Sequence, residues 1–226
     1  MKRILLAGVG VLALASLANA ADLPRQMYTK APPPMVAPYY NWTGFYLGIN
    51  GGGAWGTSNW SSTGDFDVSG GMIGGTIGYN WQTGPWVFGL EGDVDWASVK
   101  GTTNNVGCLG GGCSSENTWL GTARGRVGYA FDRWLVYGTG GAAIADLKDT
   151  YTSPTFAFVA APGATTWGWT AGGGVEYAVA DHWTVKAEYL HVGFGNRTVD
   201  NLSTFGYGLV FKDRLDIARV GINYKF

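Results

Sequence analysis

The 226 residues carry 15 Lys and Arg against 16 Asp and Glu, and a formal net charge of −1 does not indicate a nucleic-acid partner. Glycine (38 residues) and aromatic residues (15%) are abundant, whereas only 14% of residues are charged, against roughly 25% in ordinary soluble domains. So few charges would cover the surface of a soluble β-protein poorly. No apolar run long enough for a spanning helix follows residue 20, so a membrane location would require a closed barrel, whose backbone groups are all paired.

The first 20 residues resemble a secretory signal peptide. Lys2 and Arg3 form a positive start, residues 4–17 are apolar, and Ala18 and Ala20 are the small residues that a signal peptidase reads. A transmembrane helix is the alternative, but a helix needs ~20 apolar residues to cross a bilayer. We predict cleavage before Ala21, which would leave a mature chain with a formal net charge of −3 once both bases are removed.

Residues 21–41 show no alternation and contain Pro32, Pro33, Pro34 and Pro38. This composition predicts a proline-rich, extended periplasmic segment. A motif for a proline-recognising partner is the alternative, and a plain linker is the simpler interpretation.

From residue 42 to residue 226, stretches of alternating apolar and polar residues are separated by turn signals, the pattern of a transmembrane β-barrel. The three tight turns are centred on Gly84, Asp132 and Asp181, while the remaining connections are long and rich in Gly, Ser, Thr and Asn. We therefore predict an all-β fold: an eight-stranded antiparallel up-and-down barrel with short periplasmic turns and long extracellular loops. The predicted strands are 42–56, 69–82, 84–98, 117–131, 133–146, 165–180, 182–195 and 212–226.

Tyr and Trp recur on both sides of the three tight turns, as in the pairs Tyr79 and Trp86 or Tyr129 and Trp134. Both side chains prefer a membrane interface because each joins an apolar ring to a polar tip. Packing inside a soluble sandwich would not explain why the aromatic residues gather at the short-turn end.

Alternation also divides the strands into an apolar outer face and a charged inner face. The predicted inner set is balanced, with five acids and five bases: Glu91, Asp93, Asp95, Glu176, Glu188, Arg124, Arg126, Lys186, Arg219 and Lys225. Inward side chains fill the interior of a barrel of this size, and buried charges need partners. We predict a structural network of ion pairs in the lumen; a proton or ion path and a catalytic carboxylate pair are the alternatives.

The last strand alternates so that Val220, Ile222, Tyr224 and Phe226 share the outer face. This ending resembles the terminal signal by which the barrel-assembly machinery recognises outer-membrane barrels. An aromatic end on an ordinary edge strand is the alternative.

Cys108 and Cys113 lie in the second long loop, as CLGGGC. In an oxidising compartment two nearby thiols favour a disulfide; free thiols or a two-cysteine metal site are the alternatives, although that loop offers no His to complete a zinc site.

The two histidines, His182 and His191, have no local motif around them. His191 with Ser203 could imitate a lipid-modifying hydrolase, or His191 could ligate a haem, but no spacing supports either. The glycines of residues 51–53 and 172–174 lie within strands, where they relieve crowding, and are not phosphate loops. We predict no catalytic, cofactor or metal site.

Several stretches together resemble the outer-membrane immunogenic protein family, whose members are small porin-like barrels related to the β-barrel domain of outer membrane protein A. They are residues 21–24 (ADLP), 40–56 (YNWTGFYLGINGGGAWG), 78–93 (GYNWQTGPWVFGLEGD) and 220–226 (VGINYKF). The resemblance implies a monomer in the outer membrane of a Gram-negative bacterium, among outer-membrane lipid and lipopolysaccharide, with loops that antibodies recognise. The expected function is structural, in envelope integrity and host or environment contact; a narrow porin is the main alternative, and haem binding or lipid modification are further ones. No peptidoglycan-binding domain follows the last predicted strand, so wall anchoring is not expected.

Overall fold

The computed structural model describes residues 40–60, 64–103, 113–151, 159–195, 197–199 and 209–226. The predicted signal peptide, almost all of the proline-rich segment and Cys108 lie outside the described residues. The described chain is all β. Its strands are β1 (Gly44–Trp60), β2 (Gly64–Thr83), β3 (Trp86–Thr103), β4 (Cys113–Phe131), β5 (Trp134–Tyr151), β6 (Val159–Ala178), β7 (Trp183–Phe194), β8 (Arg197–Val199) and β9 (Leu209–Lys225).

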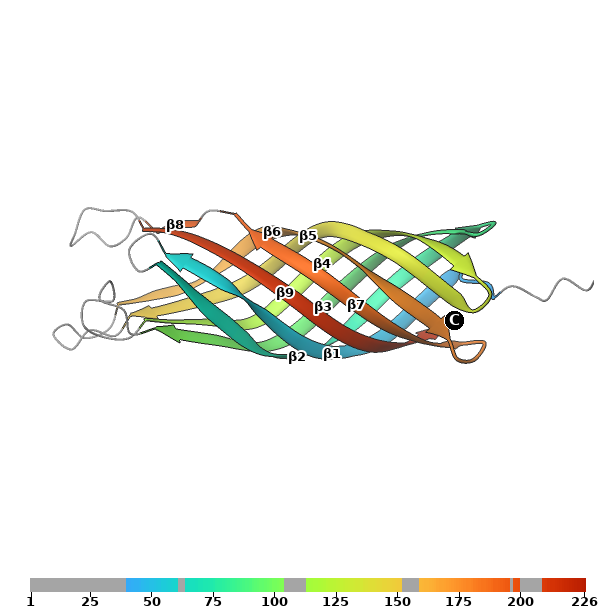
Figure 1. The fold of residues 1–226 in the computed structure, drawn as a ribbon, viewed down its shortest axis with the longest axis horizontal. Coiled ribbons are helices and arrows are strands. Elements are labelled where there is room, and N and C mark those ends of the chain that lie inside the picture. Colours follow the sequence, from blue (N-terminus) through green and yellow to red (C-terminus); the bar gives the residue numbers. More distant parts are fainter. Residues whose placement is uncertain (1–39, 61–63, 104–112, 152–158, 196, 200–208) are drawn as a thin grey trace, which may run out of the picture. The chain divides into compact units, whose positions relative to one another are not determined.

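Each strand pairs antiparallel with its neighbour, and β1 pairs with β9, so the sheet closes into a barrel (Figure 1). The short β8 occupies the same position in the barrel wall as β7, because both strands pair with β9. Within the described residues the wall therefore has eight strand positions, which confirms the predicted eight-stranded antiparallel barrel. Closure continues to the end of the chain, where the Phe226 amide donates to the Phe45 carbonyl oxygen at 2.9 Å.

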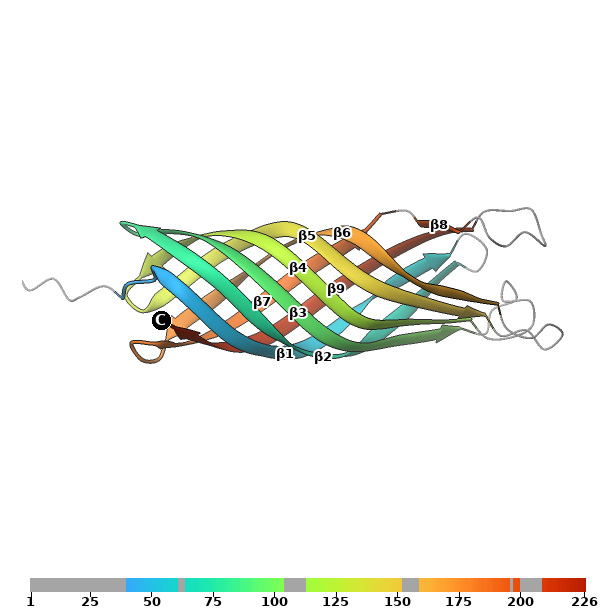
Figure 2. The ribbon, with the colours of Figure 1, turned by 180° about the vertical axis from the view of Figure 1, so that it is seen from behind.

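The three tight turns lie at the end of the barrel that also holds the C-terminus (Figures 1 and 2). Two of them need a left-handed residue: Gly84, with φ of 59°, between β2 and β3, and Asp132, with φ of 50°, between β4 and β5. Glycine and aspartate tolerate this conformation better than bulkier residues do. The turn between β6 and β7 is closed by hydrogen bonds from the Val179 and Ala180 amides to the Trp183 carbonyl oxygen.

Most strands are longer than predicted, and nearly all of the additional length lies away from the tight turns; β7, at Trp183–Phe194, is slightly shorter than the predicted 182–195. β1 extends to Trp60 and β3 to Thr103, whereas the prediction ended them at residues 56 and 98. The sequence there is mostly polar, which predicts a loop. Beyond the membrane the outer face of a barrel meets water, so strand pairing continues there without an apolar outer face, while Val99 still packs inward with 3% of its surface exposed.

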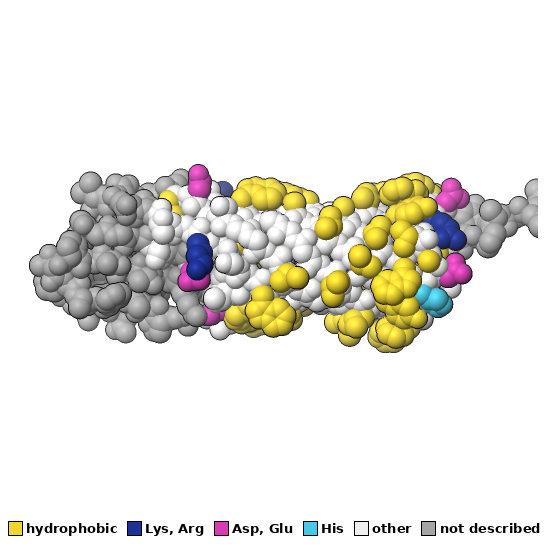
Figure 3. All heavy atoms as spheres, turned by 90° about the horizontal axis from the view of Figure 1, so that it is seen from below, with side chains coloured by type: hydrophobic (Ala, Val, Ile, Leu, Met, Phe, Trp, Pro, Cys, Tyr) yellow, Lys and Arg dark blue, Asp and Glu magenta, His cyan; other side chains and the backbone are white. Residues whose placement is uncertain are grey.

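Aromatic side chains form two girdles around the outer wall, and Figure 3 shows hydrophobic side chains gathered in two zones along one face. On β3, Trp86 and Trp96 are ten residues apart and belong to opposite girdles. Ten residues at ~3.3 Å each, tilted by ~40°, span ~25 Å along the barrel axis, the height of the apolar band of an outer-membrane barrel. The girdle near the tight turns contains Trp81, Trp86, Tyr129, Phe131, Trp134, Trp183, Tyr224 and Phe226, and the other contains Trp55, Trp96, Trp167, Trp169 and Tyr189.

Candidate functional site in the barrel lumen

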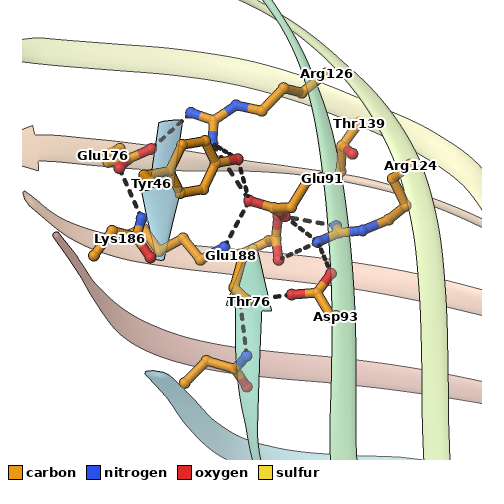
Figure 4. Close-up of polar contacts among 12 residues, drawn as sticks. Tyr46, Thr76, Glu91, Asp93, Arg124, Arg126, Thr139, Glu176, Lys186 and Glu188 are labelled. Atoms are coloured by element: carbon orange, nitrogen blue, oxygen red, sulfur yellow. Dashed lines mark hydrogen bonds and ion pairs between the residues drawn. The ribbon is translucent and has the colours of Figure 1, made fainter. Parts of the chain in front are cut away.

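Charged side chains from five strands meet inside the barrel, and Figure 4 shows those of β3, β4, β6 and β7. Every one of them is buried, with at most 4% of its surface exposed. Among the described residues the cluster joins five acids to four bases: Glu91, Asp93 and Asp95 on β3, Arg124 and Arg126 on β4, Glu176 on β6, Lys186 and Glu188 on β7, and Arg219 on β9. We call these nine residues the lumen network.

Arg124 lies at the centre of the network. Its guanidinium contacts the carboxylates of Glu91, of Asp93 at 2.7 Å and of Glu188 at 3.0 Å. Arg219 reaches two of the same strands from the other side, with Asp93 at 2.9 Å and Glu188 at 2.7 Å. The two guanidiniums share two carboxylates and so connect β3, β4, β7 and β9 across the lumen. Buried charges stabilise a fold only where each has a partner, and here each of these charges has one.

Arg126 forms the end of the network nearest the tight turns. It pairs with Glu176 at 2.6 Å and with Glu91 at 3.4 Å, and its guanidinium lies 4.2 Å from the ring centroid of Tyr137. Lys186 completes this end by donating to Glu91 at 2.9 Å. Arg219 also pairs with Asp95 at 3.0 Å, at the opposite end of the network.

Neutral hydroxyl and amide groups supply hydrogen bonds that the prediction did not include. The Tyr46 hydroxyl donates to Glu91 at 2.8 Å, and the Thr184 hydroxyl donates to Glu176 at 2.5 Å. These donors offset the excess of one acid over the bases. All of these neutral side chains occupy inward positions of the alternation. The sequence pattern therefore indicates that they face the lumen, but it does not reveal their hydrogen-bond partners. Further hydrogen bonds to the acids of the network come from Thr76, Thr122, Tyr137 and Asn223.

Glycines on the inner face of β1 and β2 leave room for the long side chains opposite. A Cβ at Gly78 would collide with the Tyr46 ring, and a Cβ at Gly52 would lie 2.8 Å from the Arg219 Cβ. Contacts this short do not occur between real side chains. Gly52 and Gly78 are therefore required by the packing of the lumen side chains and are not only a source of curvature.

Apolar layers lie on both sides of the lumen network. The layer toward the long connections contains Ala54, Met72, Ala97, Val99, Leu120, Ala143, Ala145, Leu190, Val192, Phe194, Leu215 and Ile217. The layer toward the tight turns contains Tyr40, Trp42, Val87, Ala130, Leu135, Tyr137 and Ala178. The sequence prediction placed charges in the lumen but did not anticipate these two layers.

Residues 40–43 close the barrel mouth at the tight-turn end. Trp42 is 1% exposed, and its amide donates to Gln82 Oε1 at 2.8 Å. Burial raises the pKa of the Tyr40 hydroxyl to about 12. This short segment, predicted to end a flexible linker and begin a strand, instead packs against the lumen side chains.

Lys225 was predicted to join the lumen network, and the structure places it elsewhere. Its ammonium group donates to the Asn41 carbonyl oxygen and lies 4.6 Å from the Tyr40 ring centroid. The reason is its position along the barrel axis. Lys225 is the last residue of β9, and the apolar layer toward the tight turns lies between it and the lumen network.

The other predicted residues lie apart from the lumen. Val220, Ile222, Tyr224 and Phe226 are exposed on the outer wall. His182 is in the last tight turn, where its Nδ1 lies 2.8 Å from the Lys225 carbonyl oxygen. His191 is on the outer wall beside Asp216. Ser203 and the predicted Cys108–Cys113 bridge fall outside the described residues.

Comparison with known proteins agrees with this architecture. The family described as outer membrane protein beta-barrel domain matches residues 5–226. The 31 kDa outer-membrane immunogenic protein of Brucella melitensis is 37% identical, over all of both chains. The 22 kDa outer membrane protein of Rhizobium leguminosarum is 32% identical, over 84% of this chain and 81% of its own.

A solved structure with a similar chain path is the outer membrane protein OprG from Pseudomonas aeruginosa. The match is 14% identical and covers 84% of this chain and 99% of that structure's chain, with a TM-score of 0.48. The family match and the Brucella and Rhizobium relatives, together with the closed barrel and its two girdles, determine the assignment. The chain belongs to the outer membrane protein beta-barrel domain family, with the outer-membrane immunogenic proteins among its relatives, and it is a protein of the Gram-negative outer membrane.

Proposed function

We propose that the protein is a non-conducting, structural barrel that contributes to envelope integrity and presents its long loops to the host or the environment. The observation that carries the proposal is the filled lumen, in which a paired charge network lies between two apolar layers. The name of the Brucella relatives, immunogenic proteins, supports exposure of the loops at the cell surface.

A steady ion current would need a hydrated path through all three layers. Leu120, Leu190 and Ile217 are each 0% exposed in one apolar layer, and Leu135 is 0% exposed in the other. In the described lumen at the loop side, a cavity between Ser58, Val99 and Phe194 has a volume of about 30 Å³, roughly the space of one water molecule. An ion passing these layers would lose its hydration shell without a compensating ligand.

Planar-bilayer recording of the purified protein tests the proposal. We expect no steady nanosiemens-scale conductance, measured beside a trimeric general porin as a positive control in the same bilayers. Steady conductance of that size from the wild-type protein would contradict the closed lumen and favour the narrow-porin alternative.

We also propose that the barrel has no catalytic activity. The lipid-modifying alternative depends on His191, whose imidazole contacts Asp216 and lies beside Trp169. Incubation with lipopolysaccharide followed by mass spectrometry tests this, and we expect the lipid mass to be unchanged. A mass loss that disappears in the variant His191→Phe would reverse the assignment.

A further inference from the structure

Polar side chains gather at one place on the outer wall, between β7 and β9. His191 and Asp216 are partners across these strands, and His191 Nδ1 lies 2.7 Å from Asp216 Oδ1. The Tyr189 hydroxyl donates to the same carboxylate oxygen at 2.7 Å. The side chains of His191 and Asp216 remain 34% and 27% exposed, and both point outward, since the neighbouring residues Leu190 and Ile217 point into the lumen. We call His191, Asp216 and Tyr189 the outer polar cluster.

The height of the outer polar cluster indicates what it meets. Asp216 is also the partner of Trp55 on β1, and Trp55 belongs to the girdle on the loop side. A charged group on the lipid face is costly at mid-depth but costs little near an interface. In the predicted orientation this interface is the outer leaflet, so the cluster faces the headgroups of that leaflet.

An apolar groove lies below the cluster, toward the membrane centre, and crosses the outer wall from Ile73 on β2 through β1, β9, β7 and β6 to Trp134 on β5. Its volume is about 650 Å³, and Ile49, Val185, Val220 and Ile222 are among the residues that line it. Ala187 and Gly51 also line it and contribute little or no side chain, which leaves the wall hollow there. Ala187 is four residues before His191 on the outward face of β7, so the cluster lies directly above the part of the groove that β7 and β9 line.

We propose that the outer polar cluster, together with the part of the groove below it, is a binding site for one molecule of the phosphorylated glycolipid of the outer leaflet, the lipopolysaccharide type. The groove would hold an acyl chain, while the His191 imidazole and the exposed Arg214, which is the next outward residue of β9, would contact a phosphate. Asp216 and Tyr189 would bond sugar hydroxyls, which simple phospholipids lack. The site lies on the outer wall and does not depend on whether the lumen conducts.

Native mass spectrometry of the detergent-released protein tests the site with three probes: bis-phosphorylated lipid A, dephosphorylated lipid A and phosphatidylglycerol. We expect the phosphorylated lipid A to bind about tenfold more tightly than either of the others, as expected for loss of one or two charge-assisted hydrogen bonds. Equal binding of phosphatidylglycerol would overturn the proposal.

Two variants separate the headgroup from the groove. The double variant His191→Leu with Asp216→Leu removes the outer polar cluster, and Ala187→Trp fills the groove. Both changes lie on the outer wall and should leave a heat-modifiable, folded barrel. Each should weaken binding of phosphorylated lipid A about tenfold, whereas the control Ala142→Trp, an exposed alanine on β5, should not. If Ala187→Trp loses binding while the double variant binds as the wild type does, the groove binds acyl chains in general and the headgroup assignment is overturned. Wild-type binding in both variants would overturn the site.

Discussion

Arg126 shows how much a single residue contributes to the barrel interior. It is the partner that Glu176 contacts at 2.6 Å, and it also contacts Glu91 and the Tyr46 hydroxyl. The variant Arg126→Leu would remove the guanidinium that pairs with the buried Glu176 and would leave that carboxyl group the Thr184 hydroxyl and the Asn223 amide as hydrogen-bond donors. Breaking one partner of a buried pair typically costs ~3–5 kcal/mol, so we expect the urea midpoint in detergent to fall clearly.

The control for this measurement is an ion pair at the surface. Lys100 and Glu116 lie 2.9 Å apart, but their side chains are 61% and 43% exposed. Exposed pairs contribute ~0–1 kcal/mol, so Lys100→Gln should leave the midpoint almost unchanged. Similar midpoints for the two variants would mean that water solvates the lumen and that the pairing there has little structural value.

The alternation of single residues predicted most of the lumen network. Nine of the ten predicted charges meet there, because a strand with one face in lipid leaves a charged side chain only the inner face. Lys225 also follows the alternation, but alternation gives the face and not the height. The partners themselves, such as Arg219 with Asp95, are 124 residues apart in sequence, and only the registers of the closed barrel bring them together.

At the scale of the elements, the sequence predicted the number and order of the strands but underestimated the length of most of them. The turn-side ends were placed well, because Gly84 and Asp132 mark tight turns and aromatic residues flank them. The opposite ends could not be located, since Gly, Ser, Thr and Asn form a strand or a loop equally well once the outer face is in water. The same limit hid the two apolar layers: Val87 and Val99 share the inner face of β3 with the acids, but short apolar residues are common on either face.

Two neighbouring glycines of β2 test whether the inner glycines are required by packing. Gly74 faces the lumen, and a Cβ there would lie 2.7 Å from the Asp95 Cα, whereas a Cβ at Gly75, on the outer face, would meet nothing closer than 3.8 Å. Overpacking a filled core typically costs ~1–3 kcal/mol, so Gly74→Ala should lower the urea midpoint and the folded yield. Gly75→Ala should stay within ~0.5 kcal/mol of the wild type. Equal effects of the two substitutions would show that strand propensity, rather than the lumen side chains, selects glycine here.

For the whole molecule, the asymmetry between the two ends of the barrel predicts its orientation. The tight turns and the last residue of β9 lie at one end (Figures 1 and 2), and the apolar layer with Trp42 closes the lumen there. The strands extend past the girdle only at the other end, as β3 does between Trp96 and Thr103. Outer-membrane barrels place short turns in the periplasm and long connections outside, and we expect the same orientation for this chain.

Single cysteines at the two ends test that orientation. In a background with Cys108→Ser and Cys113→Ser, Lys100→Cys would place a thiol on the extended part of β3, and Asp181→Cys would place one in the last tight turn, where the side chain is 88% exposed. Both positions are accessible to water, so only the membrane decides which of them a membrane-impermeant maleimide reaches. We expect labelling of position 100 on intact cells and labelling of position 181 only after the outer membrane is permeabilised. Labelling of position 181 on intact cells, with position 100 protected, would invert the barrel and would move the outer polar cluster from the outer leaflet to the inner one.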